Sequence, residues 1–243
     1  ITVSDTQLTV GESTVVTINF SEAVTGLSLG DFIVSNGFLG SLSTEDNITY
    51  TAILTPLPNT EDATNVIILN NTGFQDVEGN PGVGITDSNN YLVDTEAPTI
   101  QTQNITVQLN DTGNVSIQAT QVDDNSTDGF GIGSLALSQT DFDCTNVGPN
   151  TVTLTVTDVN GNEATGTAIV TVEDNTAPVV NTENITIQLD ATGNASITAA
   201  DINNGSADAC GIQSITASQT SFDCTDVGPN TVTLTVTDVN GNT

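Results

Sequence analysis

The stretch Val147–Asn162, VGPNTVTLTVTDVNGN, decides the fold, and it recurs without a change at Val227–Asn242. Within it, threonine alternates with Val152, Leu154 and Val156, which is the period-two pattern of a strand with one buried and one solvated face. The DVNGN segment that follows supplies a tight turn, because Asn-Gly accepts the positive φ that such turns need. The stretch therefore predicts a strand, a turn and the start of a second strand.

The whole neighbourhood of this stretch is repeated. Shifting the chain by 80 residues aligns Ala97–Glu163 with Ala177–Thr243 without a gap, and 42 of the 67 aligned positions are identical. The unit runs from one Ala-Pro pair to the next, which defines a second module at 97–176 and a third at 177–243 after a first module at 1–96. The third module lacks a counterpart of Ala164–Asp174, its final strand.

Short segments of alternating polarity with Asp-, Asn- and Gly-rich turns between them predict an all-β fold of tandem β-sandwich modules, with no helix longer than a turn. Because the Ala-Pro linkers are short and stiff, we expect an extended, semi-rigid rod. The strands expected in the repeat are Ile105–Leu109, Val115–Ala119, Ser134–Ser138, Thr151–Thr157 and Thr165–Val172. Those expected in the first module are Gln7–Val10, Ser13–Phe20, Phe32–Val34, Thr49–Leu54 and Val66–Leu69. The expected core includes Val107, Ile117, Val152, Leu154 and Val156, with their counterparts 80 residues on.

The composition is strongly acidic. The 243 residues contain 30 Asp and Glu but no Lys, Arg or His, which gives a formal net charge of −30. Nucleic acid is excluded as a partner because phosphate binding needs cationic side chains, and an anionic membrane surface would repel the chain. No apolar run is long enough to enter a membrane. The chain opens inside a strand pattern, ITVSDTQLTV, so we interpret it as a fragment whose missing signal peptide carries no information.

Strand parity predicts a calcium site at each module junction. If the first strand of a repeat runs away from the preceding module, the loop after the second strand and the turn after the fourth both return to the junction, where the acidic linker also enters. Carboxylates this close repel one another, and a divalent cation that prefers oxygen ligands would replace this repulsion with a net attraction. Solvated turns are the alternative, since Asp and Asn are ordinary turn residues. The candidate ligands are Asp94, Glu96, Asp123, Asp124, Asp128, Asp158 and Asn160 at the first junction, and Asp174, Asp201, Asp208, Asp238 and Asn240 at the second.

Three cysteines are present. Cys210 and Cys224 lie 14 positions apart in the third module and bracket one expected strand, so we predict a disulfide between them. Two buried free thiols are the alternative. The aligned positions in the second module are Phe130 and Cys144, so Cys144 is expected to be alone.

An enzymatic function is not expected. Without His, Lys or Arg, acid–base chemistry is limited to carboxylates and tyrosine. The carboxylates sit in the turns of repeated modules rather than around one cleft.

The motifs FDCTNVGPNTVTLTVTDVNGN and APxxxTxNITVQL resemble the SprB-type repeat of a giant cell-surface adhesin of gliding bacteria, and the wider hyalin-repeat group of extracellular Ig-like modules. This resemblance covers Ala97–Thr243. Residues 1–96 resemble a bacterial Ig-like adhesin module through Phe20–Gly26 and Gly79-Asn80. The resemblance implies an extracellular surface filament, exported by the type IX system and moved by the gliding motor.

We therefore expect a segment of a filamentous cell-surface adhesin involved in gliding and surface attachment. Its partners would be an external surface or polysaccharide, reached through other parts of the parent protein, together with the secretion or gliding machinery. The alternative is a passive, calcium-stiffened spacer in a large secreted enzyme or in an ice- or polysaccharide-binding protein. The adhesive ligand is not visible in the sequence.

Overall fold

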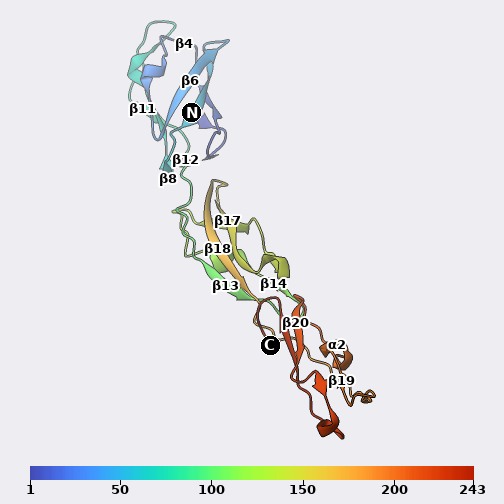
Figure 1. The fold of residues 1–243 in the computed structure, drawn as a ribbon. Helices are drawn as coiled ribbons and strands as arrows, with labels where there is room; N and C mark the ends of the chain where they lie inside the picture. The colour runs from blue at the N-terminus through green and yellow to red at the C-terminus, as the bar shows by residue number, and fades with distance from the viewer. The chain divides into compact units, whose positions relative to one another are not determined.

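The computed structural model describes residues 1–243, and its regular secondary structure consists mainly of strands, which confirms the all-β prediction (Figure 1). None of its helices has the length and apolar character needed to span a bilayer. The α-helices are single turns, Ala119–Val122 (α1) and Ala199–Ile202 (α2), and the 3-10 turns are Leu29–Asp31, Asn71–Gly73, Cys144–Asn146 and Cys224–Asp226. The chain forms two compact units: one comprises residues 1–102, 123–136 and 154–166, and the other 103–122, 137–153 and 167–243.

The first module folds into four small sheets, with strand orders β1-β3-β7-β6, β10-β4, β11-β9-β5 and β2-β12-β8. Its core holds apolar side chains from all four sheets, among them Val16, Leu54 and Tyr91. The five strands predicted here correspond to β2, β3, β5, β7 and β9. The strand bounds are β1 Thr2–Val3, β2 Gln7–Leu8, β3 Thr14–Asn19, β4 Val24–Thr25, β5 Phe32–Val34, β6 Gly37–Thr44, β7 Thr49–Pro56, β8 Glu61–Asn65, β9 Ile67–Asn70, β10 Gln75–Asp76, β11 Ile85–Asp87 and β12 Tyr91–Asp94.

The second module contains a four-stranded sheet of order β13-β18-β17-β15 and a two-stranded sheet of β14 and β16. Strand β13 is parallel to β18, so Ile105 lies opposite Val170. The predicted strand at Val115–Ala119 is shorter than expected, because helix α1 begins at Ala119. The strand bounds are β13 Ile105–Gln108, β14 Asn114–Ser116, β15 Ile132–Leu137, β16 Asp141–Asp143, β17 Gly148–Asp158 and β18 Glu163–Glu173.

Strand β17 has the register that its sequence predicts. Val152, Leu154 and Val156 are fully buried, whereas Thr153 and Thr155 remain partly exposed. Because side chains alternate between faces, the next position on the buried face is Asp158, which is also buried. The same strand that builds the core thus places a carboxylate at the core's edge.

The third module has fewer paired strands than the second. Strand β18 pairs with both β13 and β17 in the second module, and residues 177–243 contain no counterpart of it. Residues 185–188, which align with β13, are not in a strand, and the predicted core residue Ile187 is exposed. A groove of about 740 Å³, lined by Ile187, Leu189 and Val232 among others, marks the missing strand. The bounds are β19 Ala195–Ser196, β20 Ile212–Ala217, β21 Ser221–Phe222 and β22 Leu234–Asp238.

Supplying the missing strand should order this groove. When residues 164–174 are appended after Thr243, we expect the segment at 185–188 to pair as β13 does. The backbone amides of Ile185 and Ile187 should then exchange with solvent roughly 100-fold more slowly. Amide hydrogen exchange measures this directly. A scrambled extension of the same composition is the control, and equal exchange with both extensions would contradict the assignment of the groove.

Candidate metal centre

Three acidic side chains from separate elements meet in the first compact unit, and we call Asp94, Asp128 and Asp158 the first acidic centre. One carboxylate oxygen from each lies within 4.8 Å of the others. Asp94 is fully buried, Asp158 is nearly so, and Asp128 is half-buried. The chain has no basic side chain with which to neutralise them.

The turn after β17 holds Asp158 in place. Its Oδ1 accepts the N–H groups of Asn160 at 2.7 Å and Asn162 at 2.9 Å, while its Oδ2 accepts Nδ2 of Asn162 at 2.8 Å. The same Nδ2 donates to the backbone carbonyl of Asp94 at 3.1 Å. Asn162 therefore fastens the end of the first module to the DVNGN turn of the second.

The linker positions Asp128. Thr99 and Thr127 exchange two backbone hydrogen bonds, of 2.8 and 3.0 Å, so the linker pairs with the loop between α1 and β15. The Oδ1 of Asp128 accepts the N–H groups of Phe130 and Gly131 at 3.0 and 3.2 Å. This loop geometry turns the side chain of Asp128 toward Asp94 and Asp158.

Several oxygens around this centre have no hydrogen-bond partner. The Oδ1 of Asp94 accepts only the N–H of Glu96, at 3.4 Å, and its buried Oδ2 accepts none. Glu61 lies directly opposite Asp94 across the antiparallel pair of β8 and β12, and its buried Oε1 is unpartnered too. So is Oδ1 of Asn160 in the adjoining turn. Like charges directly opposite each other on neighbouring strands are destabilising.

The pKa values of Asp94 and Glu61 are both raised in this crowded, buried site. Burial raises the pKa of Asp94 to about 6, and the negative charges of Asp158 and Asp128 add to the rise. Burial also raises the pKa of Glu61, with further contributions from the charges of Asp128 and Glu96. The carboxyl groups of Asp94 and Glu61 are therefore harder to ionise than usual, mainly because of burial.

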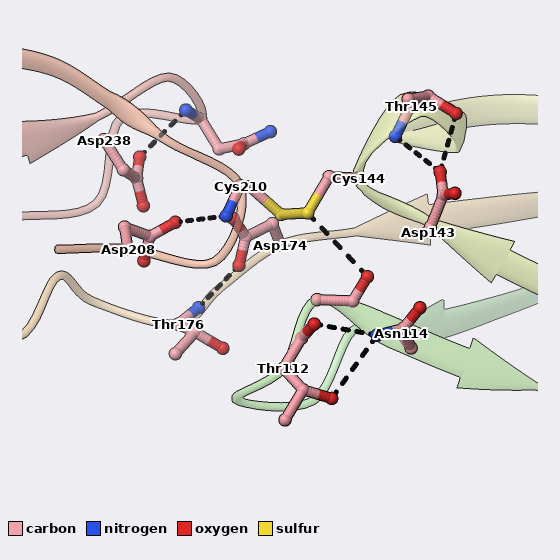
Figure 2. The surroundings of a disulfide bond; sticks show 12 residues. Thr112, Asn114, Asp143, Cys144, Thr145, Asp174, Thr176, Asp208, Cys210 and Asp238 are labelled. Carbon is pink, nitrogen blue, oxygen red and sulfur yellow. Dashed lines mark hydrogen bonds between the residues drawn. A yellow bond between two sulfur atoms is a disulfide. The ribbon is translucent and has the colours of Figure 1, made fainter.

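A related group lies 80 residues later, and we call Asp174, Asp208 and Asp238 the second acidic centre. Here carboxylate oxygens of Asp174 and Asp208 cluster with the sulfur of Cys210. Asn242 Nδ2 donates to Oδ2 of Asp238 at 2.8 Å and to the carbonyl of Asp174 at 3.0 Å, which copies the Asn162 contacts. The Oδ1 of Asp208 accepts the N–H of Cys210 at 2.7 Å. Asp174 is buried and its Oδ2 has no partner. Figure 2 shows the three carboxylates beside a disulfide.

That disulfide joins Cys144 to Cys210, so the predicted Cys210–Cys224 pairing is wrong, as is the prediction that Cys144 is alone (Figure 2). The Cα atoms of Cys144 and Cys210 are 5.2 Å apart, and Cys224 is free and exposed. The prediction treated each repeat as closed on itself, whereas the bond links consecutive repeats. Gly113 permits this approach, because a Cβ there would lie 2.6 Å from the sulfur of Cys144.

The remaining predicted ligands lie outside the two centres. Glu96 and Asp124 are exposed, and Asp123 accepts the N–H of Ser126 at 3.1 Å. Asp201 accepts the N–H and hydroxyl of Thr198 and so caps α2. The side chain of Asn240 is exposed, although its N–H bonds to Asp238. Sequence reasoning missed Glu61, because the first module does not share the repeat and its sequence carries no signal for that position.

The donor set of the first centre consists of oxygen atoms alone. Carboxylate and amide oxygens are the ligands of hard cations, whereas zinc and copper favour imidazole and thiolate. The chain has no His, and Cys210 at the second centre is bonded to Cys144. The arrangement is suited to binding a hard divalent cation.

The solved structures that resemble this chain are distant. One is the N-terminal part of the bacterial S-layer protein SbsC, with 17% sequence identity and a TM-score of 0.27; the match covers 71% of this chain and 44% of that one. Another is the endo-fucoidan hydrolase MfFcnA4 of glycoside hydrolase family 107, with 15% identity and a TM-score of 0.27; the match covers 70% of this chain and 27% of that one. A third is the Bacteroides ovatus mixed-linkage glucan utilization protein SGBP-B in complex with a mixed-linkage heptasaccharide. It has 13% sequence identity and a TM-score of 0.21, and the match covers 75% of this chain and 46% of that one. The chain thus spans less than half the length of each. No curated protein matches it.

The family comparison concerns the first module. The model of the bacterial Ig-like domain matches residues 1–93, the part of the chain that contains β1 to β12. This match agrees with the small stacked sheets and the single apolar core of that module. The match supports the resemblance of residues 1–93 to a bacterial Ig-like module.

Proposed function

We propose that this chain is a segment of a bacterial cell-surface adhesin, in which successive β-sandwich modules carry a binding region away from the cell. The Cys144–Cys210 disulfide is the observation that supports this most strongly, because it ties one repeat to the next. Disulfides persist in oxidising compartments, which suits an extracellular protein. A covalent bond between consecutive repeats serves a chain that must keep its length under load.

The finer proposal is a role in gliding motility. It rests on the resemblance of Ala97–Thr243 to the SprB-type repeat, which implies type IX export and movement along the cell surface. The proposed role is structural rather than catalytic. In support, buried aspartates recur at positions 80 residues apart, Asp94 and Asp158 first and then Asp174 and Asp238.

Live-cell labelling tests this proposal. A fluorescent antibody fragment raised against residues 97–243 should bind intact cells of the producing bacterium, and the labelled spots should travel along gliding cells. External trypsin should leave the segment itself uncut, because it contains no Lys or Arg, whereas proteinase K should remove the label. Static surface label would limit the conclusion to an adhesin that does not take part in gliding. Label found only in the culture medium would overturn the adhesin and favour a spacer in a secreted enzyme.

A further inference from the structure

The unpartnered carboxylate oxygen of Asp94 requires an explanation. Asp94 is fully buried, its Oδ2 accepts no hydrogen bond, and it faces the carboxylates of Asp128 and Asp158. A buried ionised oxygen without a partner is costly.

We propose that the first acidic centre binds one calcium ion, held by Asp94, Asp128 and Asp158 with Glu61 as a fourth carboxylate. The ion occupies the space between the three clustered carboxylates and supplies the missing partner of Asp94 Oδ2. The unpartnered Oε1 of Glu61 comes from the strand position opposite Asp94. Oδ1 of Asn160, in the turn that begins at Asp158, and water complete a shell of six to eight oxygens.

The donor set favours calcium over magnesium. Calcium accepts six to eight oxygens in flexible geometry, whereas magnesium demands a near-ideal octahedron and retains several waters. The carboxylates here come from four separate parts of the chain: strands β8 and β12, the loop before β15 and the end of β17. Such a set adjusts to a larger ion more easily than to a small one with strict angles.

The second acidic centre is a weaker copy of the first. It repeats the three aspartates and the Asn clamp, and Asp174 Oδ2 is again buried and unpartnered. It differs on its other side. At the first centre, Gly129 lies so close to the carboxylate of Glu61 that a Cβ on this glycine would clash with it. The residue that corresponds to Gly129 at the second centre is Ala209, which instead lies against Gly113 beside the disulfide. The first junction thus has a fourth carboxylate beside the three aspartates, whereas the second has a disulfide bond in that place.

The binding of an ion at the first centre has a defined structural consequence. Asp94 ends the last strand of the first module, while in the second module Asp128 lies in the loop before β15 and Asp158 ends β17. The ion therefore joins the modules through three carboxylates that repel one another without it. This inference stands whether or not the segment belongs to an adhesin.

The test measures calcium binding to the full 243-residue chain by isothermal titration calorimetry, with melting temperature as a second readout. The wild-type chain is expected to bind two ions, the tighter with a dissociation constant of about 10⁻⁴ M, and to melt at a higher temperature in calcium than in chelator. Magnesium at the same concentration should bind at least about 10-fold more weakly.

Four variants, each of which removes one carboxylate, assign the ions. Asp94→Asn should abolish the tighter binding event, and Asp174→Asn only the weaker one. Asp124→Asn is the matched control, because it makes the same change in charge on an exposed residue of the loop that carries Asp128. Glu61→Gln preserves size and should weaken the tighter event by about 10-fold, which keeps the test decisive if Asp94→Asn does not fold. An absence of calcium binding by the wild type, or equal binding by Asp94→Asn, Glu61→Gln and Asp124→Asn, would overturn the proposal.

Discussion

Replacing Cys144 or Cys210 with serine should lower the free energy of unfolding of the second compact unit by about 4 kcal/mol, whereas Cys224→Ser should change it by less than about 0.5 kcal/mol. The disulfide closes a loop with a sequence separation of 66, and a bond across so long a loop removes much of the conformational freedom of the unfolded chain. Denaturant unfolding of each variant, with the Cys224→Ser protein as the common background, measures the difference. That background prevents Cys224 from forming a replacement bond.

Thiol titration is the matching control. The oxidised wild-type chain should react with one equivalent of a thiol reagent without denaturation, and Cys224→Ser with none. If Cys210→Ser and Cys224→Ser each caused the large loss of stability and Cys144→Ser did not, the bond would lie within the third module, and the link between consecutive repeats would be refuted.

The second large effect is expected in the core. Leu154→Ala should destabilise the second module by about 3 kcal/mol, because Leu154 is fully buried in the middle of a four-stranded sheet. Its counterpart Leu234 occupies the same place in the repeat, but the third module has no strand equivalent to β18. We expect Leu234→Ala to cost about 2 kcal/mol or less, since a less enclosed site relaxes around the lost methyl groups.

Native-state hydrogen exchange separates the two effects, because it reports the opening free energy of β17 and β22 individually. Thr153→Ala and Thr233→Ala are the matched controls on the solvated face of the same two segments, and each should cost less than about 1 kcal/mol. Equal costs for Leu154→Ala and Leu234→Ala would show that the absent strand has no energetic effect.

The strand periodicity was sufficient to predict the fold class and the register of β17. The alternation of threonine with Val152, Leu154 and Val156 leaves one register that buries apolar side chains, so no tertiary information was needed. Strands without that pattern were missed. Strand β6, Gly37–Thr44, contains two glycines and two serines, and its residues are half-buried or exposed without a regular alternation of apolar and polar side chains.

Strand parity predicted the meeting of Asp94, Asp128 and Asp158, because it depends only on which end of the module each turn occupies. It does not distinguish residues within a loop. Asp124 and Asp128 lie in one loop, but only Asp128 follows the bridge between Thr99 and Thr127 that brings the loop to Asp94.

The cysteine pairing was not accessible to the same reasoning. Spacing along the chain favours a partner within the module, whereas the bond depends on where the Cys210 turn contacts the preceding repeat. Glu61 escaped prediction for a similar reason, since its place beside Asp94 arises from the pairing of β8 with β12. Contacts between elements distant in sequence decide both features.

A crystal structure of the wild-type chain grown in millimolar calcium, with anomalous scattering data, tests the central claim most directly. The account predicts an anomalous peak between Asp94, Asp128 and Asp158, with carboxylate oxygens at about 2.3–2.6 Å from it. It also predicts that Asp94 Oδ2 and Glu61 Oε1, which otherwise have no partner, both contact the ion. An ordered first acidic centre with no peak, in crystals that show calcium elsewhere on the chain, would contradict it.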